Sequence, residues 1–468
     1  MTLQTRISSP LFAIVRLPYH QIAFQAQGKT VFPYRASGKN RRATLAQTLP
    51  EDPARPHIRV MHRGADPADL LPTGSVLTED DLALPPGRWL LERSTGILSM
   101  RALMRDLCHL LVVQGMPLQR VSCFIRTLHP QANGRSVIWR NTMRDPEELM
   151  VLHGIEEAET FKTSPLPVIF NGAGAIRRRL ADPSVPLDYP VLVDLKEEGA
   201  TDYVAMPLKF SDGEINFVTW TTDAPDGFTT EQLSILDGLL PVLALRTEIL
   251  ERQKLTEELL QVYLGRNTGR RVLNGAIRRG STETIRAAIL YADVRGFTAA
   301  SDALPGPEII SMLNDYFEMM SQPIEERGGE ILKFVGDGLL AIFPLGPDSA
   351  EEDADAALKA AIEAQTLLRG RNAIREKHGK PLIEHALGLH VGDVSYGNIG
   401  SPTRLDFTVI GPAVNLASRL QGLAKELGHP IVASDLIARM VRLPVKPLGR
   451  HPIRGLRDPV EIFVPYGV

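Results

Sequence analysis

The sequence predicts a protein of the α+β class with two or three domains, and three observations support this. The chain has 468 residues, about three times the size of a typical single domain. Apolar residues at helical spacing alternate with short, strand-like apolar runs. Polar turns at 211–214 and 336–338 join neighbouring apolar runs, which indicates antiparallel hairpins.

Composition excludes several classes of protein. Hydrophobic residues make up 44% and charged residues 23%, which is typical of globular proteins and not of disordered ones. The net charge of -3 gives no reason to expect a nucleic-acid partner. Two cysteines, Cys108 and Cys123, are too few for a disulfide framework. No apolar run approaches the roughly 18 residues of a membrane span. We therefore expect a soluble, cytoplasmic protein without a membrane partner.

Residues 1–94 are predicted to be a mostly irregular leader. Residues 1–50 contain arginines and lysines but no Asp or Glu, and a proline-rich stretch follows. Acid-poor, arginine-bearing starts also occur in transit peptides. The rest of the chain gives no organellar signal, which favours a basic leader.

Residues 95–250 show the pattern of a second α+β domain. Helical spacing begins at Ile97, strand-like runs follow at 121–128 and 137–139, and a hairpin covers 203–221. Thr229 or Thr230 can cap a closing helix. This order of elements resembles a GAF domain, a sensory fold. The residues of cyclic-nucleotide-binding GAF domains are not recognisable, so the resemblance implies an unidentified small-molecule or ion regulator.

Residues 251–284 are predicted to be a helical and basic linker. Apolar spacing continues through Leu264, which indicates a dimer stalk or a coupling rod, but a surface helix ending near Lys254 is equally compatible. Residues 265–280 contain arginines and no acidic residue, which is typical of a hydrated joint between domains.

The first motif with chemical meaning follows a predicted buried strand at 285–292. Asp293 ends this strand, and residues 296–298 come next, with a glycine that permits close backbone approach. Backbone N–H groups at a helix start suit phosphate oxygens. An Asp in this position is also an ordinary helix cap, so this motif alone decides nothing.

The second motif is a hairpin. Apolar strands at 330–335 and 339–343 are joined around Gly336-Asp337-Gly338. Taken alone, Asp337 is most simply a turn residue. Lys333 stands among apolar residues of the first strand, so its ammonium must either reach solvent or meet a partner.

The third motif runs from Asp406 to Arg419. Pro412 is well placed to begin a helix, so Asn415 and Arg419, four residues apart, project from one helical face. Such a polar face is compatible with a solvated surface or with one anionic site.

Together the three motifs, in this order, resemble the class III nucleotidyl cyclases over residues 285–468. The resemblance implies a ferredoxin-like catalytic domain that forms a head-to-tail homodimer, with ATP bound between the protomers and two Mg²⁺ or Mn²⁺ ions at each site. The resemblance implies that the metals are bound by Asp293, the Val294 carbonyl and Asp337. It implies that Lys333 and Thr408 select the purine, and that Asn415 and Arg419 orient the ribose and stabilise the transition state. It also implies that phosphates are bound by Arg454 and Arg404, beside Gly296, Phe297 and Thr298.

The purine-selecting pair favours adenine. A lysine ammonium only donates, so Lys333 suits the unprotonated adenine N1, and the Thr408 hydroxyl can accept from the N6 amine. Guanine presents the opposite donor and acceptor pattern at both of these positions. The commonest residue at the second position in the family is Asp, so Thr408 resembles a subclass for which bicarbonate stimulation is known.

The sequence thus predicts an adenylyl cyclase that converts ATP to 3′,5′-cyclic AMP and pyrophosphate under control of an N-terminal sensor. Alternatives are a non-catalytic nucleotide-binding regulator and a guanylyl or diguanylate cyclase. Residues 328–330 superficially resemble the diguanylate cyclase hairpin, but they precede the strand instead of forming the turn. No general base is identified.

Overall fold

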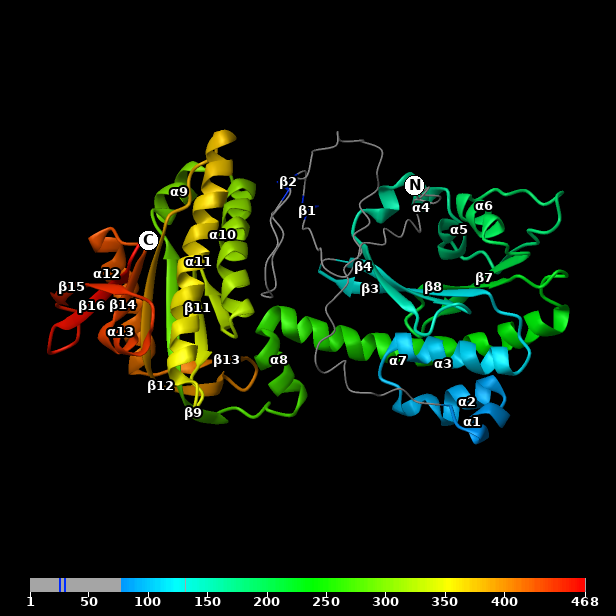
Figure 1. Cartoon of the computed structure of the whole chain (residues 1–468), viewed down its shortest axis with the longest axis horizontal. Coiled ribbons are helices and arrows are strands. Elements are labelled where there is room, and N and C mark those ends of the chain that lie inside the picture. Colours follow the sequence, from blue (N-terminus) through cyan, green and yellow to red (C-terminus); the bar gives the residue numbers. More distant parts are fainter. Residues whose placement is uncertain (1–24, 27–28, 31–76, 131, 468) are drawn as a thin grey trace, which may run out of the picture. The chain divides into compact units, whose positions relative to one another are not determined.

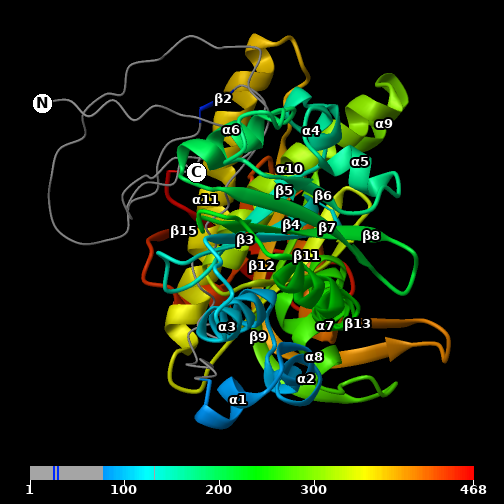
Figure 2. The same cartoon turned by 90° about the vertical axis from the view of Figure 1, so that its right-hand side faces the viewer.

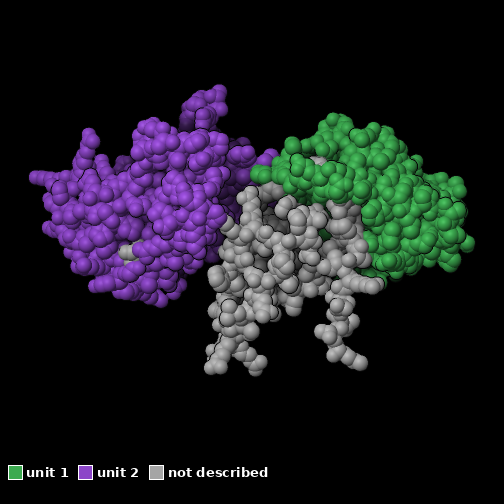
Figure 3. Space-filling view, turned by 90° about the horizontal axis from the view of Figure 1, so that it is seen from above, with its two compact units in different colours: residues 1–255 green, residues 256–468 purple. Residues whose placement is uncertain are grey.

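The computed structural model describes residues 25–26, 29–30 and 77–467 except 131, and Figure 1 shows its elements. The chain divides into two compact units, residues 1–255 and 256–468, coloured separately in Figure 3. Strands β1 (Gln25–Ala26) and β2 (Lys29–Thr30) pair as a short hairpin. Most of the predicted leader lies outside the described residues.

Helices occupy the end of the predicted irregular segment. Helix α1 (Glu79–Ala83), helix α2 (Pro86–Glu92) and a 3₁₀ turn (Ser94–Gly96) lie there, so the prediction of irregular backbone up to 94 is wrong for these residues. Thr78 and Asp81 form a capping box at α1. Trp89 and Leu90 of α2 are buried in the core of the first unit.

The first unit contains an antiparallel sheet of six strands in the order β5-β4-β3-β8-β7-β6. The predicted strands and the predicted hairpin at 203–221 are confirmed. The strands are β3 (Arg120–His129), β4 (Ala132–Arg140), β5 (Glu147–Leu152), β6 (Ile176–Arg178), β7 (Asp202–Lys209) and β8 (Ile215–Thr222).

Helices cover both faces of this sheet (Figures 1 and 2). Helices α3 (Met100–Val113) and α7 (Thr230–Leu264) lie on one face. The other face carries α4 (Glu159–Lys162), α5 (Leu166–Phe170) and α6 (Pro190–Glu197), preceded by a 3₁₀ turn at Ile155–Glu157.

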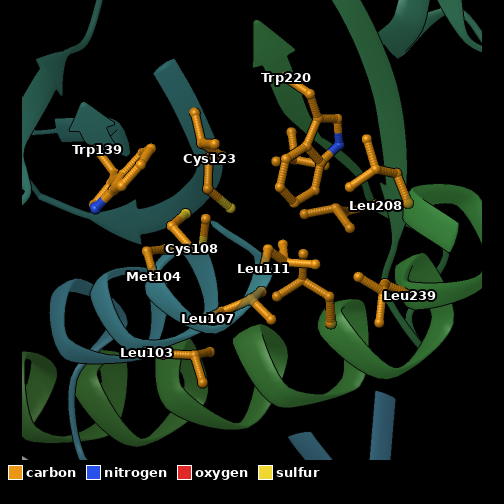
Figure 4. Packing of buried hydrophobic residues seen from close by; sticks show 14 of the residues in the cluster. Leu103, Met104, Leu107, Cys108, Leu111, Cys123, Trp139, Leu208, Trp220 and Leu239 are labelled. Carbon is orange, nitrogen blue, oxygen red and sulfur yellow. The ribbon is translucent and has the colours of Figure 1, made fainter. Parts of the chain in front are cut away.

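The core on the α3 and α7 side is closely packed. Figure 4 shows Met104 and Cys108 of α3 on the side of the helix that faces Cys123 of the sheet, whereas Leu103 lies toward α7. Cys108 and Cys123 are both buried, and both thiols are free.

Helix α7 decides between the two lengths that the sequence left open. The Thr229 side chain accepts a hydrogen bond from the Gln232 N–H at 3.1 Å, which confirms Thr229 as the cap. The helix continues to Leu264, so the alternative of an end near Lys254 is wrong. Helix α8 (Arg266–Leu273) follows directly. The GAF resemblance of the first unit and the dimer role of α7 stay predictions.

The second unit is built on an eight-stranded mixed sheet. Its order is β10-β11-β9-β12-β14-β16-β15, with β13 paired to the far half of β12. The strands are β9 (Thr282–Val294), β10 (Glu330–Val335), β11 (Gly338–Pro344), β12 (His385–Gly400), β13 (Leu405–Ile410), β14 (Ile431–Ser434), β15 (Val445–His451) and β16 (Val460–Pro465).

Alternation along β9 explains how helices bind both faces of this sheet. Ala288 and Leu290 point toward α10 (Gly306–Glu326) and α11 (Ala350–Lys377). Ala287 and Ile289 point to the opposite side, in the cluster that includes residues of α12 (Pro412–Leu427). Short helices α9 (Phe297–Ala303) and α13 (Asp435–Met440) complete the unit. The predicted α+β class is confirmed.

In the part of the chain that the structure describes, no helix combines the length and the apolar character needed to cross a bilayer.

Candidate active site

Two aspartates meet where β9 ends beside the β10–β11 hairpin. Asp293 is paired in register with Gly338, the residue directly after Asp337. A Cβ atom at Gly338 would stand 2.6 Å from the Ala292 carbonyl oxygen, so only glycine lets the hairpin approach β9 this closely. Burial and the Asp293 carboxyl, through hydrogen bonding and repulsion, raise the pKa of Asp337 to about 6. The site therefore concentrates negative charge.

A lysine partners this acidic pair. Lys425, in the last turn of α12, donates to Asp293 Oδ2 at 2.5 Å. Arg295 holds the end of α12 in place because its guanidinium donates to the carbonyls of Ala424 at 2.9 Å and His429 at 2.6 Å. Sequence reasoning missed Lys425, because no local motif connects it to Asp293, 132 residues earlier.

Residues 296–298 lie immediately after the acidic pair. Gly296 adopts a left-handed conformation with φ +67° and precedes α9. Phe297 is half-buried and Thr298 is exposed at the start of that helix. The turn places the predicted phosphate-binding segment next to Asp293 in the chain.

Lys333 belongs to a second cluster. Its ammonium donates to Asp406 Oδ2 of β13 at 3.0 Å. Thr408 lies two residues further along β13, is 4% exposed, and its hydroxyl has no hydrogen-bond partner among the described residues. The structure thus brings Lys333 of β10 to β13, the strand that carries Thr408, although the two strands are not paired in the sheet. It adds Asp406, which sequence reasoning did not assign.

Helix α12 carries the third cluster. Asn415 and Arg419 are both exposed on it, as their spacing predicted. The helix crosses β12 closely at Gly388, where a Cβ atom would stand 2.2 Å from the Ala417 carbonyl oxygen. The Arg419 guanidinium lies beside Gly455, within 3.2 Å of where a Cβ would be, and exposed Arg454 precedes that glycine.

The acidic pair and Thr408 lie opposite different positions of β12, whereas Lys333 stands four residues before Asp337 on the same hairpin. On β12, Asp293 lies opposite Ala386, whereas Thr408 lies opposite Gly397. Arg404, in the turn between β12 and β13, is exposed beyond the Thr408 end. The ion pair between Lys333 and Asp406 therefore links β13 to the hairpin that carries Asp337.

The acidic pair suits a divalent metal ion by its donor chemistry. Hard cations prefer oxygen ligands, and Mg²⁺ is commonly held by one or two carboxylates together with substrate phosphates. Asp293, Asp337 and the Val294 carbonyl offer such a set, and the raised pKa of Asp337 marks a repulsion that a cation relieves. Within the described residues, no group of three or more His, Cys, Asp or Glu forms a metal cage.

Comparison with known proteins identifies the second unit. Its residues 281–463 match the model of the adenylate and guanylate cyclase catalytic domain. This segment is therefore similar to the catalytic domains of adenylate and guanylate cyclases. An adenylate cyclase of Anabaena cylindrica is 40% identical over 172 residues, which cover 36% of this chain and 33% of that protein. The chain thus matches about one third of the length of that relative.

Solved structures with likeness to the cyclase domain include enzymes of both purine classes. The adenylyl cyclase CyaB from P. aeruginosa is 29% identical over 39% of this chain and 94% of its own, with a TM-score of 0.35. The guanylyl cyclase Cya2 is 31% identical over 40% of this chain and 94% of its own, with a TM-score of 0.36.

Proposed function

We propose that this chain is an adenylyl cyclase that converts ATP to 3′,5′-cyclic AMP and pyrophosphate. The observation that carries the proposal is the convergence of Asp293 and Asp337 inside a domain that matches the cyclases. The reaction is an in-line attack of the ribose 3′-oxygen on the α-phosphorus, with pyrophosphate as the leaving group. Catalysis of such a transfer rests on positioning and charge stabilisation.

Different residues of the chain would bind the metals, orient the ribose and stabilise the charge on the phosphates. Asp293, Asp337 and the Val294 carbonyl would hold two Mg²⁺ or Mn²⁺ ions, which supply positive charge to the phosphates and to the attacking oxygen. Arg419 meets negative charge that develops on the phosphoryl oxygens, and Asn415 orients the ribose. Arg454 and the N–H groups of residues 296–298 bind the remaining phosphate oxygens.

Selection of ATP rests on hydrogen-bond direction. Lys333 can only donate, which matches adenine N1 and opposes the N1–H of guanine. The buried Thr408 hydroxyl lacks a partner among the described residues, so it is available to accept from the adenine N6 amine. Asp406 supports this arrangement because it holds the Lys333 ammonium near Thr408.

We further propose that the enzyme is a homodimer with shared sites. The chain has one domain similar to the cyclases, which carries both half-sets of site residues, and the resemblance implies that two chains share each site. Two identical chains then form two equivalent sites. The first unit would act as the sensor, and Thr408 makes bicarbonate a candidate activator.

A product assay tests the proposal. The purified full chain is incubated with ATP or GTP plus Mg²⁺ or Mn²⁺, and the products are separated by chromatography. We expect cyclic AMP and pyrophosphate from ATP, with less product from GTP. Cyclic GMP or cyclic di-GMP as the main product would favour the alternatives, and nucleotide binding without turnover would indicate a non-catalytic regulator.

A further inference from the structure

We propose that the Lys425 ammonium neutralises the acidic pair while no metal is bound, and that it moves away from Asp293 when a divalent metal ion enters. Lys425 would then set how tightly the domain binds the metal. It is a positioning residue, because it acts through Asp293 and not on the nucleotide. This inference rests on the proposed function, since it takes Asp293 and Asp337 as the metal-binding carboxylates.

Lys425 is the cation in contact with the acidic pair. Its Nζ donates to Asp293 Oδ2 at 2.5 Å. Within the part of the chain that the structure describes, no other basic side chain forms an ion pair with Asp293 or Asp337. The charge of Lys425 also acts to lower the pKa of Asp337, against the larger rise that burial and Asp293 cause. The ammonium therefore offsets part of the repulsion between the two carboxylates.

The end of α12 does not require the Lys425 side chain. A lysine in the last turn of a helix commonly binds the carbonyl groups left free there. In this helix the Ala424 carbonyl already accepts from the His429 N–H at 3.1 Å and from the Arg295 guanidinium at 2.9 Å. The Lys425 ammonium points instead to Asp293, 132 residues earlier in the chain. Its contact is therefore with the candidate metal site and not with its own helix.

The backbone at Lys425 is held in place, whereas its side chain is free to move. Helix α12 packs on β12 at Gly388, and Arg295 binds the carbonyls at the end of the helix. The side chain of Lys425 is 37% exposed. A lysine ammonium stands on a flexible four-carbon stem, so it can leave Asp293 for water without a movement of the helix.

The lysine and a metal ion exclude each other at Asp293. A protonated ammonium has three donors and no acceptor, so it cannot serve as a metal ligand. A carboxylate oxygen that accepts from Lys425 is a poorer ligand for a hard cation, and the two positive charges repel each other even in water. The two cations therefore compete for the acidic pair, and the presence of Lys425 lowers the affinity for the metal.

Titration of the full chain with Mn²⁺ alone tests this competition, with calorimetry or the electron paramagnetic resonance signal of free Mn²⁺ as the readout. Lys425→Met should bind Mn²⁺ about 10-fold more tightly or better, because the competing charge is gone. Lys425→Arg keeps the charge and should stay within about 3-fold of the unaltered protein. Lys446→Met is the matched control, because Lys446 is exposed on β15, at the other edge of the sheet, and should leave the affinity unchanged.

Asp293→Asn separates a failure of this inference from a failure of the proposed function. The Mn²⁺ binding that this variant loses belongs to the acidic pair. If Asp293→Asn loses it, and a Lys425→Met protein with a normal circular dichroism spectrum binds Mn²⁺ no more tightly than the unaltered protein, the inference is overturned and the metal site stands. If Asp293→Asn and the unaltered protein bind Mn²⁺ equally, the metal-binding role of the pair is refuted as well.

Chemical labelling of the unaltered chain tests the movement of the side chain without any variant. Lysines are acetylated with sulfo-N-hydroxysuccinimide acetate, in EDTA or in saturating Mn²⁺, and each site is quantified by mass spectrometry. An ion-paired ammonium gives up its proton less readily, so acetylation of Lys425 relative to Lys446 should rise several-fold in Mn²⁺. An unchanged ratio would overturn the proposal, because Lys425 would then keep the same partner with and without the metal.

Discussion

The two sheets of this protein place their polar groups in opposite ways. In the cyclase domain, the charged residues stand at strand ends, in a hairpin turn and on the exposed side of a helix, namely Asp293, Asp337 and Arg419. In the first unit, Arg120 and Thr219 lie inside one sheet face and are almost fully buried. The first arrangement suits a hydrated, highly charged substrate. The second keeps its polar groups within the packed interior of the unit.

The largest effect is expected for the acidic pair. Asp337→Asn should lower cyclic AMP formation by about 10² to 10³ or more, because one of two metal-binding carboxylates is lost. Circular dichroism should show an intact fold, since the residue lies in a turn. Asp348→Asn, an exposed aspartate beyond the same hairpin, is the control and should be near normal. Near-normal turnover of Asp337→Asn would remove the role given to the pair.

The next prediction separates a shared site from a site within one chain. Asp337→Ala and Arg419→Ala should each be nearly inactive alone. Mixed in equal amounts with free exchange, they should regain roughly a quarter of normal activity, because half of the dimers contain one intact site. No recovery, in a mixture shown by tagged pull-down to contain heterodimers, would contradict the shared site and leave the reaction itself unaffected.

A smaller change is expected in purine selection. Lys333→Glu should lower the ratio of ATP to GTP turnover by about 10-fold or more, since one good base contact is worth roughly 1 to 3 kcal/mol by analogy with base readout in nucleic acids. The ratio of kcat/KM for the two nucleotides is the measurement. Lys359→Glu, an exposed lysine on α11, is the charge-matched control. An unchanged ratio would refute the role of Lys333.

The smallest effect concerns the partner of Lys333. Asp406→Asn should raise KM for ATP by no more than about 5-fold, because exposed ion pairs contribute roughly 0.2 to 1 kcal/mol. The side chain of Asp406 is 60% exposed, which places the pair in this class. Steady-state kinetics at varied salt checks the prediction, and high salt should narrow the gap to the unaltered protein. A collapse of kcat would instead indicate direct contact with the substrate.

Local chemistry explains which parts of the fold the sequence predicted. The hairpin around Asp337 and the cap at Thr229 are determined by residues within a few positions of each other, so pattern reasoning placed both. Helix α2 was missed because prolines surround it, although Trp89 and Leu90 anchor it by burial. Residue spacing does not encode such tertiary anchoring.

The candidate sites show the same division. Asp293 and Arg419 stand in recognisable motifs, whereas Lys425 reaches Asp293 only through the path of α12 across the sheet. A cavity of the first unit is built from several strands and helices that are far apart in the sequence. No local segment contains enough of that cavity to be recognised.

Helix α12 packs against β12 at Gly388, and this contact restricts which residues the position can accept. Gly388 has no side chain, so α12 packs directly on its backbone. The separation between α12 and β12 is therefore limited by contact between main-chain atoms. Adding one methyl group there would lift the helix that carries Asn415 and Arg419. Misplacing a catalytic group by about 1 Å can cost about 10²-fold in rate. The position of Arg419 on α12 is thus set in part by packing at Gly388.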